Sequence, residues 1–296
     1  MNKYLSGHVA ALFTIFIWGT TFISTKILLV DFKPIEILFF RFLIGLAVLM
    51  IIYPKRLKNT TKNQEITFAL AGLCGVTLYF LLENIALTYS MASNIGVIIS
   101  IAPFFTAMIS HFVLKEKSLK LNFIIGFIAA MTGIALISFN GTNNFQLNPL
   151  GDILALLAAL VWAIYSILTK KISEYGYNTI QVTRRIFMYG VAFMLIALIP
   201  FGFELNLSRF NNPVYLGNII FLGLGASALC FVTWNVAVKI LGAVKTSIYI
   251  YIVPVVTVVT SVIVLNEKIT MMALMGTILT LIGLFLSQNK EDKNNG

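Results

Sequence analysis

The chain has 296 residues, of which 59% are hydrophobic and 11% are charged, whereas soluble domains are usually about 45–50% apolar and about 25% charged. This composition excludes an ordinary soluble fold and indicates a chain that folds in a lipid bilayer. The formal net charge of +10 does not indicate a nucleic-acid partner, because the basic residues lie between apolar runs rather than on one face of a soluble element.

Ten apolar runs are long enough to cross a bilayer, since a spanning helix needs about 20 mostly apolar residues. We therefore predict an all-α integral membrane protein with ten transmembrane helices, placed in the cell (plasma) membrane. In chain order the predicted helices are 8–30, 34–54, 66–90, 94–114, 121–139, 150–169, 179–203, 213–234, 246–265 and 270–287. Cys74 and Cys230 fall inside these runs and have no metal-binding spacing.

The basic residues predict the orientation of these helices. With a cytoplasmic N-terminus, the segments on that side hold 14 lysines and arginines, and the outer loops hold 3. Cytoplasmic loops of membrane proteins carry an excess of these residues. The distribution therefore predicts that both termini are cytoplasmic.

One segment of the chain occurs twice. Residues 86–117 align without a gap with residues 237–268, and 11 of the 32 positions are identical. The matches include a proline followed thirteen residues later by Glu-Lys, in each copy. Outside this segment, Trp18 aligns with Trp162 and Arg41 with Arg185. Such self-similarity indicates a duplicated unit.

Each unit contains five predicted helices, an odd number, so the second unit must be inverted in the membrane relative to the first. Inverted repeats are a known transporter architecture, with the substrate site between the repeats near the midplane. The predicted organisation is a first five-helix repeat at 1–140, an outer linker at 141–149, a second repeat at 150–288 and a cytoplasmic tail at 289–296.

Several of these features together make the chain resemble a known family. They are Trp18-Gly19 in the first helix, Pro34 with Arg41 in the second, and the two repeated segments ending in Glu-Lys. On them the chain is similar to the drug/metabolite transporter superfamily, in its ten-helix EamA-type branch. The resemblance covers essentially the whole chain and implies transport, since members export amino acids, metabolites or drugs, and some import. The second repeat departs from the first at Asn178, which replaces an opening proline, and at Trp234, which replaces Glu83.

Polar, aromatic and small residues recur at helical spacing on one side of several predicted helices. The small residues are typical of helix packing, whereas the aromatic and hydroxyl groups are suited to contact a solute. Trp18 and Trp162 lie roughly 15 Å into their helices, which is mid-membrane rather than interfacial. The predicted substrate-binding residues are Trp18, Thr21, Tyr79, Glu83, Ser100, Trp162, Tyr165, Trp234 and Tyr251, with Trp234 also suited to a gate.

Glu83 is the carboxylate placed deepest in an apolar run, and an ionisable residue there is by default a functional hypothesis with a named partner. One interpretation is an ion pair with Lys26 or Arg41 that closes an outer vestibule as a gate. The other is that Glu83 binds a substrate amine or carries a coupling proton. For Arg41, a further interpretation is that it extends to the lipid headgroups.

Pro103 and Pro254 are predicted in the middle of two equivalent helices. Proline within a helix removes a hydrogen bond and clashes with the preceding turn, and membrane proteins tolerate this where neighbours satisfy the freed carbonyl. The two prolines therefore predict either static kinks or bends that let these helices move between states.

The function predicted from these patterns is secondary active transport by alternating access, with export of amino acids or related small metabolites. The alternative is efflux of lipophilic or cationic drugs, followed by an intramembrane enzyme or a passive channel. We expect no cofactor and no metal, because the chain has no phosphate-binding glycine motif and no catalytic constellation within its spans. The expected partners are a small-molecule substrate and the bilayer, with proton coupling left open, and the expected state is a monomer.

Overall fold

The chain is described here by a computed structural model that covers residues 3–90, 92–115, 119–138, 148–256, 259–260 and 271–287. Within these residues the structure is helical and has no strands. The first repeat comprises α1 (Lys3–Leu28), α2 (Pro34–Ile52), α3 (Lys62–Gly72), η1 (Leu73–Leu78), α4 (Tyr79–Tyr89), α5 (Ala92–Ile99), α6 (Ala102–Val113) and α7 (Leu121–Ser138). The second comprises α8 (Pro149–Ser173), α9 (Thr179–Leu198), η2 (Leu207–Asn211), α10 (Pro213–Ile220), η3 (Phe221–Leu229), α11 (Cys230–Leu241), α12 (Ala243–Ser247), η4 (Ile248–Ile252) and α14 (Met271–Ser287).

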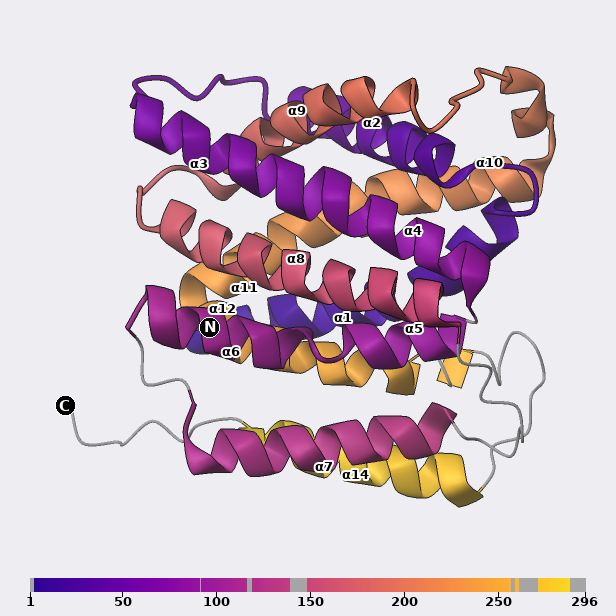
Figure 1. Cartoon of the computed structure of the whole chain (residues 1–296). Helices are drawn as coiled ribbons and strands as arrows, with labels where there is room; N and C mark the ends of the chain where they lie inside the picture. Colours follow the sequence, from indigo (N-terminus) through magenta and orange to yellow (C-terminus); the bar gives the residue numbers. More distant parts are fainter. Residues whose placement is uncertain are drawn as a thin grey trace.

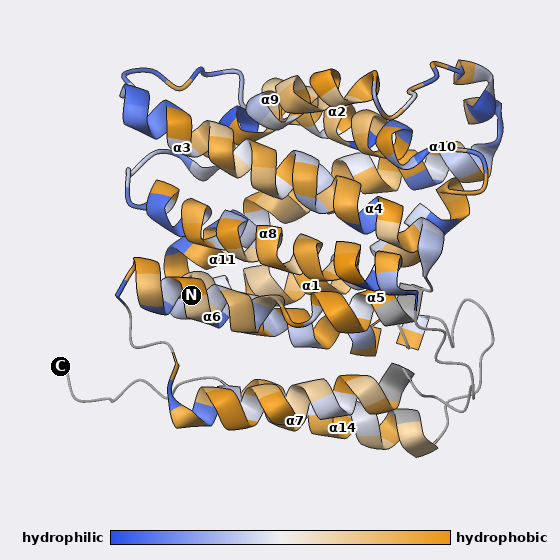
Figure 2. Cartoon of the chain, in the orientation of Figure 1, coloured by the Kyte–Doolittle hydropathy of each residue, from blue (hydrophilic) through white to orange (hydrophobic). Residues whose placement is uncertain are grey.

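The ten predicted membrane helices are confirmed. Seven described helical stretches are long and apolar enough to cross a membrane, and three shorter apolar helices occupy the remaining predicted spans, at Leu121–Leu136, Ala243–Val256 and Leu274–Ser287. Most residues in the middle of the helices are hydrophobic, and hydrophilic residues are concentrated at the helix ends (Figure 2). Residues 261–265 of the ninth predicted helix, and the predicted linker and tail at 141–147 and 289–296, lie outside the described residues.

Local chemistry explains where several helices begin. Pro34, Pro149 and Pro213 occupy the first turn of α2, α8 and α10, where the missing N–H is not needed and the fixed φ suits a helix. Asn178 replaces the proline in the second repeat, and its side-chain oxygen accepts a hydrogen bond from the amide of Ile180 at 2.9 Å. Asparagine at this position caps α9, so the departure from the repeat pattern keeps the helix start.

The helices of one repeat pack against those of the other in equivalent pairs. The first helix of each repeat contacts the third span of its partner, in the pairs α1 with α11 and α8 with α4. The second helices do the same, in the pairs α2 with η3 and α9 with α3 and η1. The last helices, α7 and α14, lie side by side at one edge of the bundle (Figure 1). This exchange of contacts is the inverted-repeat arrangement that the odd helix number predicts.

Both third spans contain a π-helical turn at the same place in the repeat. The turn is η1 in the first repeat and η3 in the second, and the repeat offset superimposes them. Such turns insert extra residues into a helix and often occur at functional sites. Tyr79 follows η1 directly, so this turn sets the direction in which the Tyr79 and Glu83 side chains point.

The α7–α14 contact predicts a sharp effect of one methyl group. A Cβ on Gly283 would lie 2.4 Å from the backbone nitrogen of Ala130 and 2.6 Å from the carbonyl oxygen of Gly126. Because both atoms belong to the backbone, Gly283→Ala should force the helices apart and lower the free energy of unfolding by about 1–3 kcal/mol. Thermal unfolding of the purified protein in detergent measures this change.

Gly217 provides the matched control, because a Cβ there meets nothing within 4 Å. Gly217→Ala should leave the melting temperature unchanged or slightly raised, since alanine favours a helix over glycine. Equal melting temperatures for Gly283→Ala and the unaltered protein would contradict the close contact.

Candidate functional site

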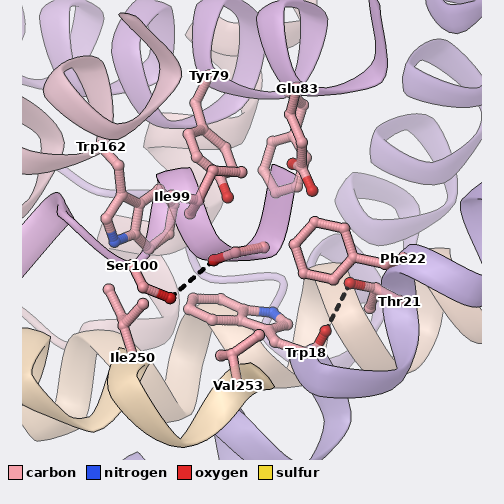
Figure 3. A pocket seen from close by; sticks show the side chains of 12 residues that line it. Trp18, Thr21, Phe22, Tyr79, Glu83, Ile99, Ser100, Trp162, Ile250 and Val253 are labelled. Carbon is pink, nitrogen blue, oxygen red and sulfur yellow. Dashed lines mark hydrogen bonds between the residues drawn. The ribbon is translucent and has the colours of Figure 1, made fainter. Parts of the chain in front are cut away.

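A cavity lies at the centre of the bundle, where helices of the two repeats meet. About 500 Å³ of space in and around it is free of protein atoms, part of it open to the outside. Side chains from α1, α4, α5, α8 and the η4 region point toward it (Figure 3). Its lining residues are Trp18, Thr21, Phe22, Tyr79, Phe80, Glu83, Gly96, Ile99, Ser100, Trp162, Ile250 and Val253.

Two interrupted helices border this cavity. The fourth span breaks at Ser100 and Ile101, between α5 and α6, and the ninth span tightens into the 3-10 helix η4. Pro103 and Pro254 follow these irregular stretches by two residues each. A regular α-helix would pair the carbonyl of Ile99 with the amide of residue 103, which proline lacks. Irregular backbone at membrane depth occurs where protein or a cavity surrounds it, and both breaks meet that condition here.

Aromatic rings form one wall of the cavity. The ring centres of Trp18 and Trp162 are 5.1 Å apart in an edge-to-face arrangement, and those of Trp18 and Trp234 are 5.0 Å apart. The indole nitrogen of Trp18 donates to the carbonyl oxygen of Ala226 at 3.0 Å. Because its N–H is bound to backbone, Trp18 is held in place and offers the cavity its ring rather than a donor.

The polar groups of the cavity include free acceptors and also a donor, the indole N–H of Trp162, which is buried and has no hydrogen-bond partner among the described residues. The hydroxyls of Thr21 and Ser100 donate to carbonyls of their own helices, at 2.8 and 2.7 Å, which leaves their oxygen lone pairs free to accept. Glu83 is 5% exposed and interacts with the Tyr79 hydroxyl one turn earlier. Its Oε2 atom is buried and has no hydrogen-bond partner among the described residues. The cavity therefore holds a carboxylate of which one oxygen lacks a donor among the described residues.

The predicted ion pair of Glu83 is not found. Lys26 donates instead to the carbonyl oxygens of Leu87 and Ser90, at 2.5 and 3.1 Å. In the part of the chain that the structure describes, no basic side chain lies within 4.0 Å of the Glu83 carboxylate. Lys26 therefore ties α1 to the end of α4 through backbone groups and not through a charge pair.

Arg41 also differs from both of its interpretations. It does not reach the headgroups, since it is 1% exposed. Its Nε donates to the hydroxyl of Ser227 at 3.0 Å, and its guanidinium lies 4.3 Å from the ring centre of Phe80. Arg41 thus binds η3 and an aromatic face, and acts on Glu83 electrostatically without direct contact.

The structure places six of the nine predicted substrate-binding residues around the cavity, namely Trp18, Thr21, Tyr79, Glu83, Ser100 and Trp162. Tyr165, Trp234 and Tyr251 are not among the residues that line it, and all three are fully buried. Tyr165 donates to the side-chain oxygen of Asn235 at 3.0 Å, and Trp234 packs behind Trp18 and Trp162. These residues form a second layer because adjacent turns of one helix face lie at different depths from the cavity.

The sequence-based prediction omitted several apolar lining residues, among them Phe22, Phe80, Ile250 and Val253. In sequence these resemble the residues that face lipid, so composition cannot distinguish them. Phe22 and Phe80 lie next to the predicted residues Thr21 and Tyr79, and this adjacency is the one available signal.

Comparison with known proteins identifies relatives over nearly the whole chain. The sequence profile described as the EamA-like transporter family matches residues 5–139 and 149–288. A protein of Archaeoglobus fulgidus named "Uncharacterized transporter" is 28% identical over 294 residues, covering 96% of this chain and 98% of its own. A protein of Clostridium kluyveri with the same name is 27% identical, covering 98% and 95%. One solved crystal structure aligns with a TM-score of 0.72 at 19% identity, over 95% of this chain and 96% of that chain, which shows a shared fold.

The second layer predicts a stability effect at Tyr165. Tyr165→Phe removes the donor to the buried side-chain oxygen of Asn235. The Asn235 amide cannot turn away freely, because its nitrogen donates to the Thr183 hydroxyl at 3.0 Å. An unsatisfied buried acceptor costs about 1–3 kcal/mol, so the free energy of unfolding should fall by that amount in a detergent melt. Tyr89→Phe is the control, because Tyr89 is 48% exposed and its change should be within about 0.5 kcal/mol. Equal effects of the two substitutions would contradict the layer assignment.

Proposed function

We propose that this chain, which belongs to the EamA-like transporter family, is a secondary active transporter that exports amino acids or related small metabolites, and is not an enzyme. As a multi-pass protein of the plasma membrane, it moves a small-molecule substrate across the bilayer. The central cavity is its solute site, and the two repeats, at 1–140 and 150–288, move relative to each other around that site.

One observation carries the assignment of the solute. The buried Oε2 of Glu83 has no donor among the described residues, and it faces a cavity whose described lining contains no lysine or arginine. A solute ammonium group satisfies this carboxylate, because a buried ion needs a partner of opposite charge and hydrogen bonds. The aromatic walls accommodate the apolar part of the same solute and attract its cation through their ring faces. Small amphipathic amines, amino acids first, combine these properties.

A second candidate is efflux of lipophilic cations. The described residues that line the cavity include one carboxylate and no lysine or arginine, so they provide no cation for a solute carboxylate. A lipophilic cation needs only a carboxylate and aromatic walls, and the cavity has both. An amino acid also needs a partner for its own carboxylate during transport. Arg41, which lies behind Phe80, is the nearest basic group for that role.

We propose alternating access as the mechanism, with both termini in the cytoplasm. The rings of Trp18, Trp162 and Trp234 are in contact with one another, and we propose that this cluster closes the cavity toward the end where α1 begins. The breaks before Pro103 and Pro254 give the equivalent helices of both repeats a point at which to bend. Movement there would separate the tryptophans and open the end that they close, while the opposite end closes. Because one chain supplies both halves of the site, a monomer is sufficient.

Glu83→Gln tests the solute assignment. The amide keeps the size of the side chain but removes its charge, so saturable exchange of amino acids in proteoliposomes should fall at least ten-fold. Glu174→Gln is the control, because Glu174 is an exposed carboxylate at the end of α8, and its exchange rate should match that of the unaltered protein. Exchange of tetraphenylphosphonium but not of any amino acid would favour the second candidate, and flux that does not saturate would indicate a channel.

A pH gradient separates the two roles of Glu83. If Glu83 carries a coupling proton, an imposed gradient accelerates solute flux in the unaltered protein and has no effect in Glu83→Gln. Exchange at equal pH is then retained in the variant, since exchange requires no net proton movement. If Glu83→Gln changes neither the flux driven by a pH gradient nor the exchange at equal pH, the proposal that Glu83 takes part in transport is contradicted.

A further inference from the structure

The end of α2 and the beginnings of α3 and α9 lie at one end of the bundle (Figure 1). A second hollow is lined by residues from this region. About 810 Å³ of space in and in front of it is free of protein atoms, part of it open to the outside, and the proposed solute path does not use it. Its walls combine three arginines with apolar side chains, including Arg56, Arg184, Arg185, Met50, Leu57 and Met188.

Arg184 is the buried cation of this hollow. It is 6% exposed, and its two terminal nitrogens donate to the carbonyl oxygens of Tyr53 and Lys55, at 2.6 and 2.7 Å. Both acceptors are uncharged, and the structure forms no ion pair to Arg184 within the residues it describes. A guanidinium has five N–H donors, so Arg184 has a positive charge and further donors that the protein leaves without an anionic partner.

Arg185 beside it is neutralised. Its Nε and Nη2 donate to the two carboxylate oxygens of Glu65, at 3.0 and 2.7 Å, and the Tyr189 hydroxyl binds the same carboxylate at 2.6 Å. None of the described residues that line the hollow is acidic. Its described lining includes three basic side chains, Arg56, Arg184 and Arg185, of which only Arg185 is paired with a carboxylate. The hollow therefore has a strongly positive field that attracts anions.

The apolar side of the hollow continues into the lipid-facing surface. Met50 and Met188, which line it, are 42% and 38% exposed. Seven residues away along the same helix faces, Leu43 and Leu195 are 42% and 52% exposed, and a separation of seven returns to one side of a helix. Apolar faces of α2 and α9 thus lead from the membrane into a basic pocket at its edge.

We propose that this hollow binds the phosphate headgroup of an anionic phospholipid, whose acyl chains lie along the exposed faces of α2 and α9. Arg184 and Arg56 bind the phosphate oxygens, while Met50 and Met188 contact the first methylene groups of the chains. Basic pockets between helices at the cytoplasmic surface are known to bind such headgroups. A soluble phosphate would use the arginines but not the apolar walls, so the combination of the two favours a lipid.

Thermal unfolding of the full chain in detergent, with added lipid, tests this site. Phosphatidylglycerol should raise the melting temperature by several degrees, because a ligand that binds the folded state stabilises it. Phosphatidylcholine, which has a neutral headgroup, and glycerol 3-phosphate, which has no acyl chains, should each raise it by less than one third of that shift. Arg184→Gln and Arg56→Gln should each increase the phosphatidylglycerol concentration for half-maximal stabilisation at least three-fold.

Lys171→Gln is the matched control, because it removes one exposed positive charge from the end of α8, outside the hollow. It should leave the phosphatidylglycerol concentration for half-maximal stabilisation unchanged. Should Arg184→Gln fail to fold, Arg56→Gln decides alone, because the side chain of Arg56 is exposed and has no ion pair among the described residues. The proposal is overturned if phosphatidylcholine stabilises as strongly, if glycerol 3-phosphate alone is sufficient, or if Arg56→Gln binds phosphatidylglycerol like the unaltered protein.

Discussion

The lack of water inside a bilayer governs this structure. Each backbone N–H and C=O at membrane depth needs a partner from the protein, so a broken helix is tolerated only where other helices or a cavity surround it. This chain breaks two of its spans, at Ser100–Ile101 and at η4. Both breaks must therefore be enclosed, and the inverted arrangement encloses them by turning the fourth and ninth spans toward each other's repeat.

The central cavity follows from that enclosure. Ile99 and Ser100 line it from one break, and Ile250 and Val253 from the other. The first helix of each repeat then contributes a tryptophan, Trp18 or Trp162, whose rings are in contact. The two repeats differ at the third span, where Glu83 lines the cavity and its counterpart Trp234 packs behind it. The pseudo-symmetric frame thus holds one acidic group on one side of the cavity, which under the proposed function gives a bound solute a defined orientation.

The sequence predicted the fold well because its signals are long. Apolar runs, the basic bias and a repeat of 32 residues each extend over many positions, and the spans and the inverted packing follow from them. It also identified the helix faces that include Trp18, Tyr79 and Glu83. It did not resolve depth along those faces, so Tyr165 and Tyr251 were predicted to contact solute although both are buried behind the lining.

The partners of the charged residues were also beyond a sequence-based prediction. Lys26 binds carbonyl oxygens of α4, and Arg41 lies over Phe80 and binds Ser227 of the other repeat. Carbonyl groups and ring faces exist at every position of the chain, so their availability depends on how the helices pack. The similar depth of Glu83, Lys26 and Arg41 in their helices suggested an ion pair. In the structure both basic side chains bind carbonyl, hydroxyl or ring groups instead.

The claim on which this account depends is that both repeats enclose a solute site at the helix breaks, reachable in turn from each side of the membrane. The most direct measurement is the labelling of a Ser100→Cys variant, with Cys74→Ser and Cys230→Ala removing the native thiols, by a membrane-impermeant maleimide. The account predicts labelling in right-side-out and in inverted vesicles, and none for a lipid-facing Leu195→Cys control. Labelling of Ser100→Cys from one side only, or from neither, would contradict it.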